Sequence, residues 1–323
     1  MKRRRFITLV GGAAASWPLT ALAQQASTRV YRLGYLAPAH ISHLVDALFG
    51  ALRDLGYVEG QNLKVEYRYG TGKELDELAA ELAKGKPDVI VTVATPPALA
   101  AKRATTTIPI VMATAGAPVS LGVVASLARP GGNVTGVTLY GSELNAKRIE
   151  IFREAVPTIK QLAFLANAKN TYSRFLWGEA EPASLRIELK PVLYELQELS
   201  DLPATFLDMD HKQIDGVIVF SDALFNNARR QITALAAEHH LPAMYEAREF
   251  VDEGGLISYG PDIEEMTRRS AIYVDKVLKG ADPSTLPIEQ PTRFELAINA
   301  KSAKALGLSL SPTLLARADE VIE

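Results

Sequence analysis

The sequence predicts an α/β fold of two doubly wound, parallel-sheet lobes that are joined by a hinge. From Val30 onward, short apolar segments alternate with segments of helical periodicity, which is typical of βαβ units and a mainly parallel sheet. The alternation starts again near residue 144. After an N-terminal export signal, about 300 residues remain, which is more than one hydrophobic core usually accommodates.

The N-terminus has the layout of a secretory signal. A basic head at Met1–Phe6 precedes the mostly apolar stretch 7–22, and Ala21-Leu22-Ala23 fits a cleavage site before Gln24. We therefore expect residues 1–23 to be a cleaved signal peptide and the mature protein to be periplasmic. The arginines of the head also resemble a twin-arginine export signal. The alternative, an uncleaved membrane anchor, needs a longer and more strongly apolar stretch.

The composition argues against several classes of function. The formal net charge is −2, and basic and acidic residues are mixed along the chain, so we expect no nucleic-acid partner. The chain contains no cysteine, which removes disulfides, thiolate nucleophiles and thiolate metal sites. Stability must therefore come from packing.

The first lobe should contain five strands with helices between them. The apolar spacing from Ile41 to Leu55 predicts a helix that Gly56 ends. Thr95 followed by Pro96 predicts a helix start, with the hydroxyl as N-cap and proline at the first helical position. We expect strands at 30–36, 63–69, 88–93, 108–112 and 134–139, and helices at 41–55, 75–82, from 96 onward and at 118–128.

The second lobe should repeat this pattern. Asp262 and Glu265 form a capping-box-like start for a long amphipathic helix. Residues 167–210 receive no assignment, because three prolines interrupt any long helix there. We expect strands at 161–166, 215–220, 241–245 and 256–259, helices at 142–155, 226–239 and 262–280, and an extended crossover at 283–291.

These elements divide the chain into two discontinuous lobes. Lobe 1 is expected to comprise residues 30–143 together with about 262–285. Lobe 2 is expected to comprise 144–261 together with about 286–323.

Motifs of catalysis and cofactor binding are missing from the sequence. It has no G-x-S-x-G, no G-x-x-x-x-G-K-[ST], no G-x-G-x-x-G and no H-E-x-x-H. His40 and His43 have the i, i+3 spacing of a metal pair, but no third ligand lies nearby in the sequence. We expect neither a metal nor a cofactor, and no enzyme activity.

The loops at the carboxyl ends of the strands are therefore the remaining candidates for a functional site, because doubly wound folds bind ligands there. Helix N-termini in such loops would hold a ligand carboxylate, with the hydroxyls of Thr95 and Thr114 beside it. Asp222 follows a buried strand, where it would either pair with a ligand ammonium or merely cap the next helix. Tyrosines would supply flat walls. The candidate ligand-binding residues are Tyr35, His40, Ser42, Thr95, Pro96, Thr114, Ala115, Asn167, Tyr172, Asp222, Ala223, Tyr245 and Tyr259.

Several long runs of residues resemble one family. These runs are Leu55-Gly56-Tyr57-Val58-Glu59-Gly60-Gln61-Asn62, Ala125-Ser126-Leu127-Ala128-Arg129-Pro130-Gly131-Gly132-Asn133-Val134-Thr135-Gly136, Gly254-Gly255-Leu256-Ile257-Ser258-Tyr259-Gly260 and Leu315-Ala316-Arg317-Ala318-Asp319-Glu320-Val321-Ile322. They are similar to ABC-transporter substrate-binding proteins related to tryptophan-binding receptors.

The resemblance implies a type I periplasmic-binding-protein fold with three hinge crossovers and a cleft that closes on an amino acid, often an aromatic one. It also implies that Thr95-Pro96 is the family's threonine-proline loop and that Asp222 is its acidic residue after the second-lobe strand. In two places the sequence departs from the family pattern. Ala117 precedes Pro118-Val119 where many relatives have Asp, and residues 167–210 match no relative.

The predicted function is that of a monomeric binding protein that hands an amino acid with a bulky apolar or aromatic side chain to the membrane permease of an ABC importer. A carboxylic acid without an ammonium group is an alternative ligand, for which Asp222 would be a liability. A ligand-sensing domain would use the same fold. An exported α/β enzyme would need Asp222 or Glu246 as a general base.

Overall fold

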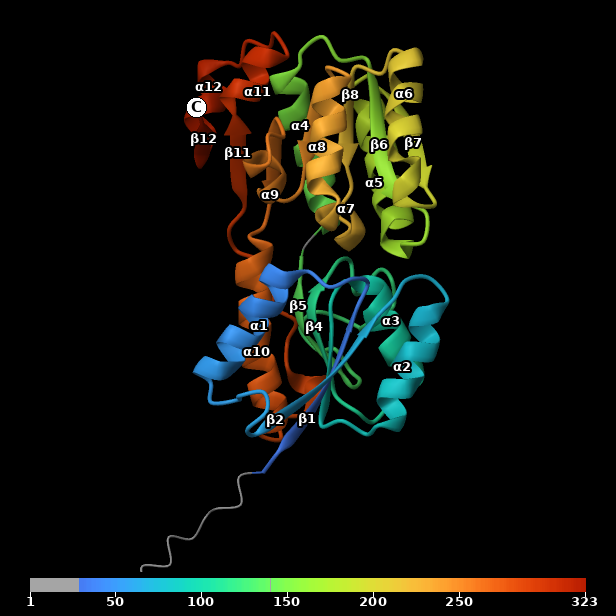
Figure 1. The fold of residues 1–323 in the computed structure, drawn as a ribbon, viewed down its shortest axis with the longest axis vertical. Coiled ribbons are helices and arrows are strands. Elements are labelled where there is room, and N and C mark those ends of the chain that lie inside the picture. The colour runs from blue at the N-terminus through green and yellow to red at the C-terminus, as the bar shows by residue number, and fades with distance from the viewer. Residues whose placement is uncertain (1–28, 140) are drawn as a thin grey trace, which may run out of the picture.

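The computed structural model describes residues 29–139 and 141–323. The predicted signal peptide lies outside these residues. Two α/β lobes follow one another along the long axis of the molecule, as Figure 1 shows. The predicted fold class of two lobes with parallel sheets is confirmed.

Lobe 1 is built on a five-stranded sheet with the order β2-β1-β3-β4-β5. All of its strand pairs are parallel. The strands are β1 (Tyr31–Ala37), β2 (Leu63–Tyr69), β3 (Val89–Thr92), β4 (Ile110–Ala115) and β5 (Val134–Thr138). The helices are α1 (Ser42–Asp54), α2 (Glu74–Lys84), α3 (Thr95–Ala104) and, from much later in the chain, α10 (Ile263–Leu278).

The sheet of lobe 1 is buried on both faces, which explains why β3 is a continuous apolar run. Val89 and Val91 pack in one core with side chains of α1 and α10, whereas Ile90 packs in another with side chains of α2 and α3. In Figure 1 these two helix pairs lie on opposite sides of the sheet. Because α10 completes one of these faces, the core of lobe 1 is incomplete without residues that come after most of lobe 2 in the sequence.

Lobe 2 is built on a seven-stranded sheet with the order β12-β11-β10-β9-β8-β6-β7. Its pairs are parallel except for β10 with β11. The strands are β6 (Gln161–Asn167), β7 (Lys190–Leu196), β8 (Gly216–Val219), β9 (Ala243–Tyr245), β10 (Ile257–Gly260), β11 (Glu295–Asn299) and β12 (Glu320–Ile322).

Helices cover both faces of this sheet as well. Phe164 of β6 packs in one core with α4 and α5, and its neighbour Leu165 packs in the other with α6 and α8. The helices are α4 (Gly141–Ala155), α5 (Thr171–Arg186), α6 (Leu202–His211), α7 (Ala223–Asn227), α8 (Arg229–Glu238), α9 (Glu249–Asp252), α11 (Ala300–Ala305) and α12 (Pro312–Arg317), with short 3-10 turns at η1 (Leu199–Asp201) and η2 (Pro283–Thr285).

The chain passes between the two sheets three times: between β5 and α4, between β10 and α10, and on the way from η2 to β11. On the third passage, the backbone of Glu289 pairs with β5 through hydrogen bonds to Gly136 and Thr138. The chain therefore leaves lobe 1 after Glu289, a few residues later than the expected boundary at about 286.

One predicted helix is absent. Residues 118–128 were expected to be helical, but they form only a turn, with Leu121 N–H bonded to Ala117 O and Gly122 N–H to Val119 O. Gly122 has φ +71°, a left-handed conformation that ends the turn. The predicted helix at 226–239 is also different, because it begins earlier and is divided into α7 and α8 at Ala228.

The segment 167–210, which the sequence left unassigned, contains α5, β7 and α6. Helix α5 continues through Pro182. Proline removes the hydrogen bond to the carbonyl four residues earlier, which belongs here to Gly178. Both residues are exposed. The carbonyl that loses its helical partner therefore has access to water, and the helix tolerates the proline.

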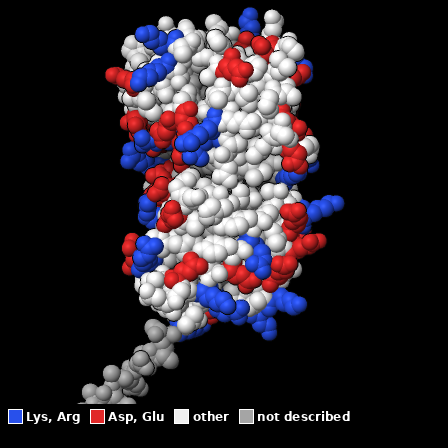
Figure 2. Space-filling view, viewed as in Figure 1, with Lys and Arg blue, Asp and Glu red and all other residues white. Residues whose placement is uncertain are grey.

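Among the described residues, no helix is both long enough and apolar enough to cross a membrane. On the face shown in Figure 2, residues of both charge signs alternate along the margins, and the region where the lobes meet is largely uncharged.

Candidate functional site

A cavity lies between the two lobes, where the carboxyl ends of several parallel strands face one another. In this arrangement of the lobes the cavity is narrow, with a volume of about 40 Å³, and it is partly open to solvent. Residues that follow β1, β3, β4 and β5 meet residues that follow β6 and β8. The lining consists of Ile41, Leu44, Val93, Ala94, Thr95, Thr114, Gly116, Leu139, Asn170, Tyr172, Ser221, Asp222, Ala223, Asn226 and Ile263.

Asp222 is the acidic group of this lining. It follows β8 and caps α7, because its Oδ1 accepts a hydrogen bond from Leu224 N–H at 2.8 Å. Its Oδ2 accepts two more, from Asn170 Nδ2 at 2.9 Å and Asn167 Nδ2 at 3.0 Å. The residue is 9% exposed. The capping role and the site role considered for Asp222 are therefore compatible.

Burial raises the pKa of the Asp222 carboxyl above its ordinary value, and the amides of Asn170 and Asn167 and backbone N–H groups only partly offset this effect. These partners are all neutral. Within the described part of the chain, the groups that stabilise the ionised form include no cation. A buried carboxylate without a counter-charge is costly, and a cation brought by a ligand would lower that cost.

On the lobe 1 side, the start of α3 is held by hydrogen bonds to the end of β4 and the loop that follows it. The Thr95 hydroxyl donates to Gly116 O and accepts from Gly116 N–H, each at 2.9 Å. Ala94 N–H donates to Thr114 Oγ1 at 3.3 Å. Both hydroxyls therefore bind backbone groups and hold the two loops together.

The expected cap of α3 is wrong. Ala94 occupies the N-cap position, and Thr95 is the first helical residue. Ala94 has φ 70° and ψ 168°, a conformation that is costly for any residue with a side chain. Pro96 and Pro97 have no N–H, so this helix start offers fewer donors to a ligand than the sequence suggested. Backbone strain of this kind is typical of binding sites.

Apolar side chains close the cavity on the remaining sides. Ile41 and Leu44 of the α1 region, Leu139 of the first crossover and Ile263 of α10 pack in the same apolar cluster as the core of lobe 2. The lobes therefore share a buried apolar contact, which is the arrangement of a closed cleft.

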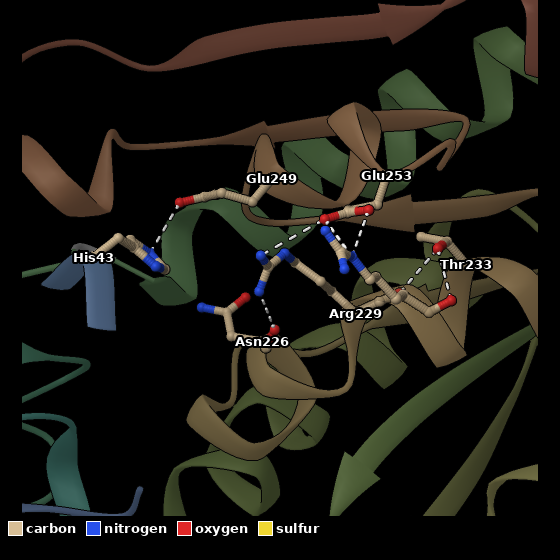
Figure 3. A network of polar contacts seen from close by, with 7 residues as sticks. His43, Asn226, Arg229, Thr233, Glu249 and Glu253 are labelled. Carbon is tan, nitrogen blue, oxygen red and sulfur yellow. Dashed lines mark hydrogen bonds and ion pairs between the residues drawn. The ribbon is translucent and has the colours of Figure 1, made fainter. Parts of the chain in front are cut away.

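Polar contacts across the rim also join the lobes. His43 Nε2 of α1 lies 3.5 Å from Glu249 Oε1 of α9, and Asn227 Nδ2 donates to His40 O at 3.3 Å. Figure 3 shows His43 and Glu249 pointing toward one another, beside the ion pair of Arg229 with Glu253.

The structure brings together some of the predicted site residues. Thr95, Thr114, Tyr172, Asp222 and Ala223 line the cavity. Asn167 reaches Asp222 by a hydrogen bond. His40 lies at the rim, where its Nδ1 is 3.0 Å from Tyr69 Oη. Pro96 and Ala115 stand next to lining residues in the sequence without lining the cavity themselves.

Other predicted residues lie elsewhere, because side chains of strand residues alternate between the faces of the sheet. Tyr35 is in the core of lobe 1, in an aromatic cluster with Phe49, Tyr67 and Tyr69. Tyr245 stacks on Phe250, and Tyr259 lies against Phe294. Ser42 is exposed at the start of α1. These tyrosines are not walls of the cavity.

Glu246, the other carboxylate considered as a general base, belongs to a buried ion pair. Its Oε1 lies 3.2 Å from Arg148 Nη2, and both side chains are 4% exposed. Arg148 Nε also donates to Tyr259 O at 2.7 Å. The carboxylate is therefore occupied inside lobe 2 and does not line the cavity.

Sequence reasoning placed Asn170 and Gly116 within the cleft loops 167–172 and 114–119 but singled out neither residue. Asn170 accepts a hydrogen bond from Tyr172 N–H and thereby caps α5. Both residues come shortly after a buried strand, which is the same signal that identified Asp222. The sequence therefore indicated both loops, but not which of their side chains would reach Asp222 or the facing lobe.

Fold and site together define a class of protein: a two-lobed receptor of the type I periplasmic-binding fold, with a polar anchor in the cleft between its lobes. The chain belongs to the family of ABC transporter substrate binding proteins, whose model matches residues 38–322. The resemblance found in the sequence is therefore confirmed.

Three proteins of known structure or binding activity are similar to this chain. A tyrosine-binding protein of Clostridioides difficile (strain R20291) is 27% identical over 260 residues, which are 80% of this chain and 74% of that protein. The structure of an ABC domain in complex with L-Trp from Streptococcus pneumonia has a TM-score of 0.81 at 24% identity, covering 91% of this chain and 100% of that one.

The third is the ligand-free, open structure of a substrate binding protein with adhesive properties from Clostridium difficile. Its TM-score is 0.61 at 22% identity, over 91% of this chain and 99% of that one.

Proposed function

We propose that this protein is the periplasmic binding component of an ABC importer and that it encloses an amino acid with a bulky apolar or aromatic side chain between its lobes. The observation that carries this proposal is Asp222, a buried carboxylate in the cleft that is held by neutral donors only. A ligand ammonium would supply the missing positive charge. The tyrosine-binding relative and the L-Trp complex favour an aromatic amino acid.

In the proposed complex, the ligand ammonium lies on lobe 2 at Asp222, and its carboxylate lies on lobe 1 near the starts of α1 and α3. The first N–H groups of α1 have no helical partner of their own and carry the positive end of the helix dipole. The side chain would contact the apolar lining residues Ile41, Leu44, Leu139 and Ile263, and the ring of Tyr172. Closure of the two lobes would then bury both ends of the ligand.

Isothermal titration of the chain from Gln24 onward against each protein amino acid tests the ligand. We expect micromolar or tighter binding of L-tyrosine or L-tryptophan. The same titration with the matching acids that lack the amino group tests the role of Asp222. Asp222→Ala should lose affinity for the amino acid by about a hundredfold, as expected for removing one partner of a buried charge pair, and should bind the matching acid no more weakly than before.

Asp208→Ala, which removes an exposed carboxylate from α6 of the same lobe, is the matched control and should bind normally. Failure of the wild-type protein to bind any amino acid would reject the ligand class.

Export is a separate part of the proposal. The signal at residues 1–23 predicts that the protein recovered from a periplasmic fraction begins at Gln24. Mass spectrometry of the intact protein measures this directly. A mass that includes residues 1–23 would contradict cleavage.

A further inference from the structure

Gly116 of lobe 1 and Tyr172 of lobe 2 meet across the cavity. A Cβ atom built on Gly116 would lie 2.1 Å from Tyr172 Cζ and 2.5 Å from both Cε2 and Oη. These three are the nearest heavy atoms to that position, and all belong to the other lobe. The ring of Tyr172 therefore occupies the space that any side chain at position 116 would need.

The backbone of Gly116 has little freedom to retreat from this contact. Its N–H and its carbonyl oxygen both bind the Thr95 hydroxyl, at 2.9 Å each. Its φ is not positive, so alanine would be tolerated here by the backbone of lobe 1 alone. The obstacle to a side chain comes from Tyr172, which belongs to the facing lobe.

The ring of Tyr172 is held just as firmly. Tyr172 is 4% exposed, its ring stacks on Phe175 at 6.3 Å, and its N–H donates to Asn170 Oδ1 at 3.0 Å. Asn170 Nδ2 donates in turn to Asp222 Oδ2 at 2.9 Å. One amide side chain thus connects the acidic group of the cavity to the backbone of the residue that touches lobe 1.

We propose that Gly116 and Tyr172 form a steric gate, in which the absence of a side chain at position 116 allows the Tyr172 ring to seat and the lobes to close. Asn170 is the positioning residue that fixes the ring relative to Asp222. The gate deepens the proposed function, because it assigns the contact that decides whether the cleft closes over its ligand. It does not depend on which amino acid is bound.

Gly116→Ala should leave each lobe intact and disfavour the closed state. We expect its affinity for L-tyrosine or L-tryptophan to fall by at least about tenfold, because overpacking a fixed contact is costly. Gly116→Ala combined with Tyr172→Ala should recover closure, since the double variant restores the space. Gly178→Ala is the matched control, because a Cβ there would have no neighbour within 4 Å.

The lobe arrangement can be measured independently of affinity. The chain has no cysteine, so Glu77→Cys on α2 and Glu179→Cys on α5 give one spin label on each lobe. Distances between the labels should show a short component in the otherwise wild-type protein, with L-tyrosine or L-tryptophan increasing it. Gly116→Ala should deplete this component, and the double variant with Tyr172→Ala should restore it.

The outcomes separate the gate from the ligand. A short component in Gly116→Ala equal to that of the wild type would overturn the gate, and so would a double variant as open as Gly116→Ala. A wild-type protein that closes but binds no amino acid, with the short component still lost in Gly116→Ala, would reject the proposed ligand and support the gate.

Discussion

His43 Nε2 and Glu249 Oε1 lie 3.5 Å apart, so a contact that is an ion pair when the imidazole is protonated joins helix α1 of one lobe to helix α9 of the other (Figure 3). Each side chain is 32% exposed. Burial acts to raise the pKa of Glu249, but the nearby His43 imidazole, a backbone N–H and the charge of Arg229 outweigh it and leave that pKa below its ordinary value. The pair therefore links the closed arrangement to pH.

The stability difference between the wild type and Glu249→Gln should therefore depend on pH. A carboxyl whose pKa is lowered by folding contributes stability above its ordinary pKa and loses it as the pH falls through the lowered value. We expect the wild-type protein to be more stable than Glu249→Gln at about pH 6 by roughly 0.2–1 kcal/mol, as for partly exposed pairs. The difference should vanish toward about pH 3.

Thermal unfolding across this pH range measures the effect. Glu179→Gln, on the exposed side of α5, is the control and should follow the wild type at every pH. A difference between the wild type and Glu249→Gln that does not change with pH would show that the pair is not the cause.

In the free protein, the stability that Asp222 contributes should depend on pH in the opposite direction. Burial raises its pKa, so its contribution to stability is present below the ordinary carboxyl pKa and is lost as the pH rises through the raised value. In the proposed complex, a ligand ammonium binds the ionised carboxylate. We therefore expect affinity for an amino acid to fall by about tenfold for each pH unit below the raised pKa, while the free protein becomes more stable.

Titration calorimetry and thermal unfolding over the same pH series test both trends at once. Asp222→Asn should remove the acid limb of the affinity profile. Equal pH profiles for this variant and the wild type would contradict the assignment of Asp222 as the group that holds the ammonium.

The difference between Asp222 and the tyrosines shows what the sequence can predict about the site. Asp222 directly follows a buried strand, and the carboxyl ends of parallel strands meet at the cleft whatever the details of packing. For Tyr35 and Tyr245, the sequence indicates the strand but leaves open which face each ring takes. That choice depends on neighbours such as Phe49 and Phe250, which are distant in the sequence.

The order of most strands and helices was predictable from the sequence, because apolar periodicity is a local signal. The β3 and α10 segments are clear examples, and both are present close to the expected bounds. The expected helix at 118–128 is absent, because Gly122 and the loop after β4 override a weak apolar period. Contacts between lobes, such as that of Gly116 with Tyr172, have no local signal at all.

Asn170 should affect both stability and binding. It caps α5 and donates to Asp222, so Asn170→Ala removes a cap worth about 1 kcal/mol and also a donor to the buried carboxylate. We expect a loss of stability near that value together with a roughly tenfold loss of affinity for the proposed amino acid ligand, since a hydrogen bond to a charged group is worth about 1.5–3 kcal/mol.

Asn299 offers a matched control for this prediction. It caps α11 with the same kind of side chain, accepting from Ser302 N–H, and lies away from the cavity. Asn299→Ala should lose comparable stability in urea unfolding without any change in titrated affinity. A similar loss of affinity in both variants would mean that capping alone accounts for the effect of Asn170.

Gly136 distinguishes a glycine needed within a lobe from one needed between lobes. It lies in β5 with φ +124°, and a Cβ there would be 2.2 Å from Met112 O of the neighbouring strand β4. Unlike the ring that faces Gly116, this neighbour is backbone inside the sheet and cannot separate when the lobes open. Gly136→Ala should therefore destabilise the protein by at least about 2 kcal/mol in urea unfolding, through both backbone strain and overpacking. Tyr172→Ala should not restore the stability of Gly136→Ala, whereas it should restore lobe closure in Gly116→Ala.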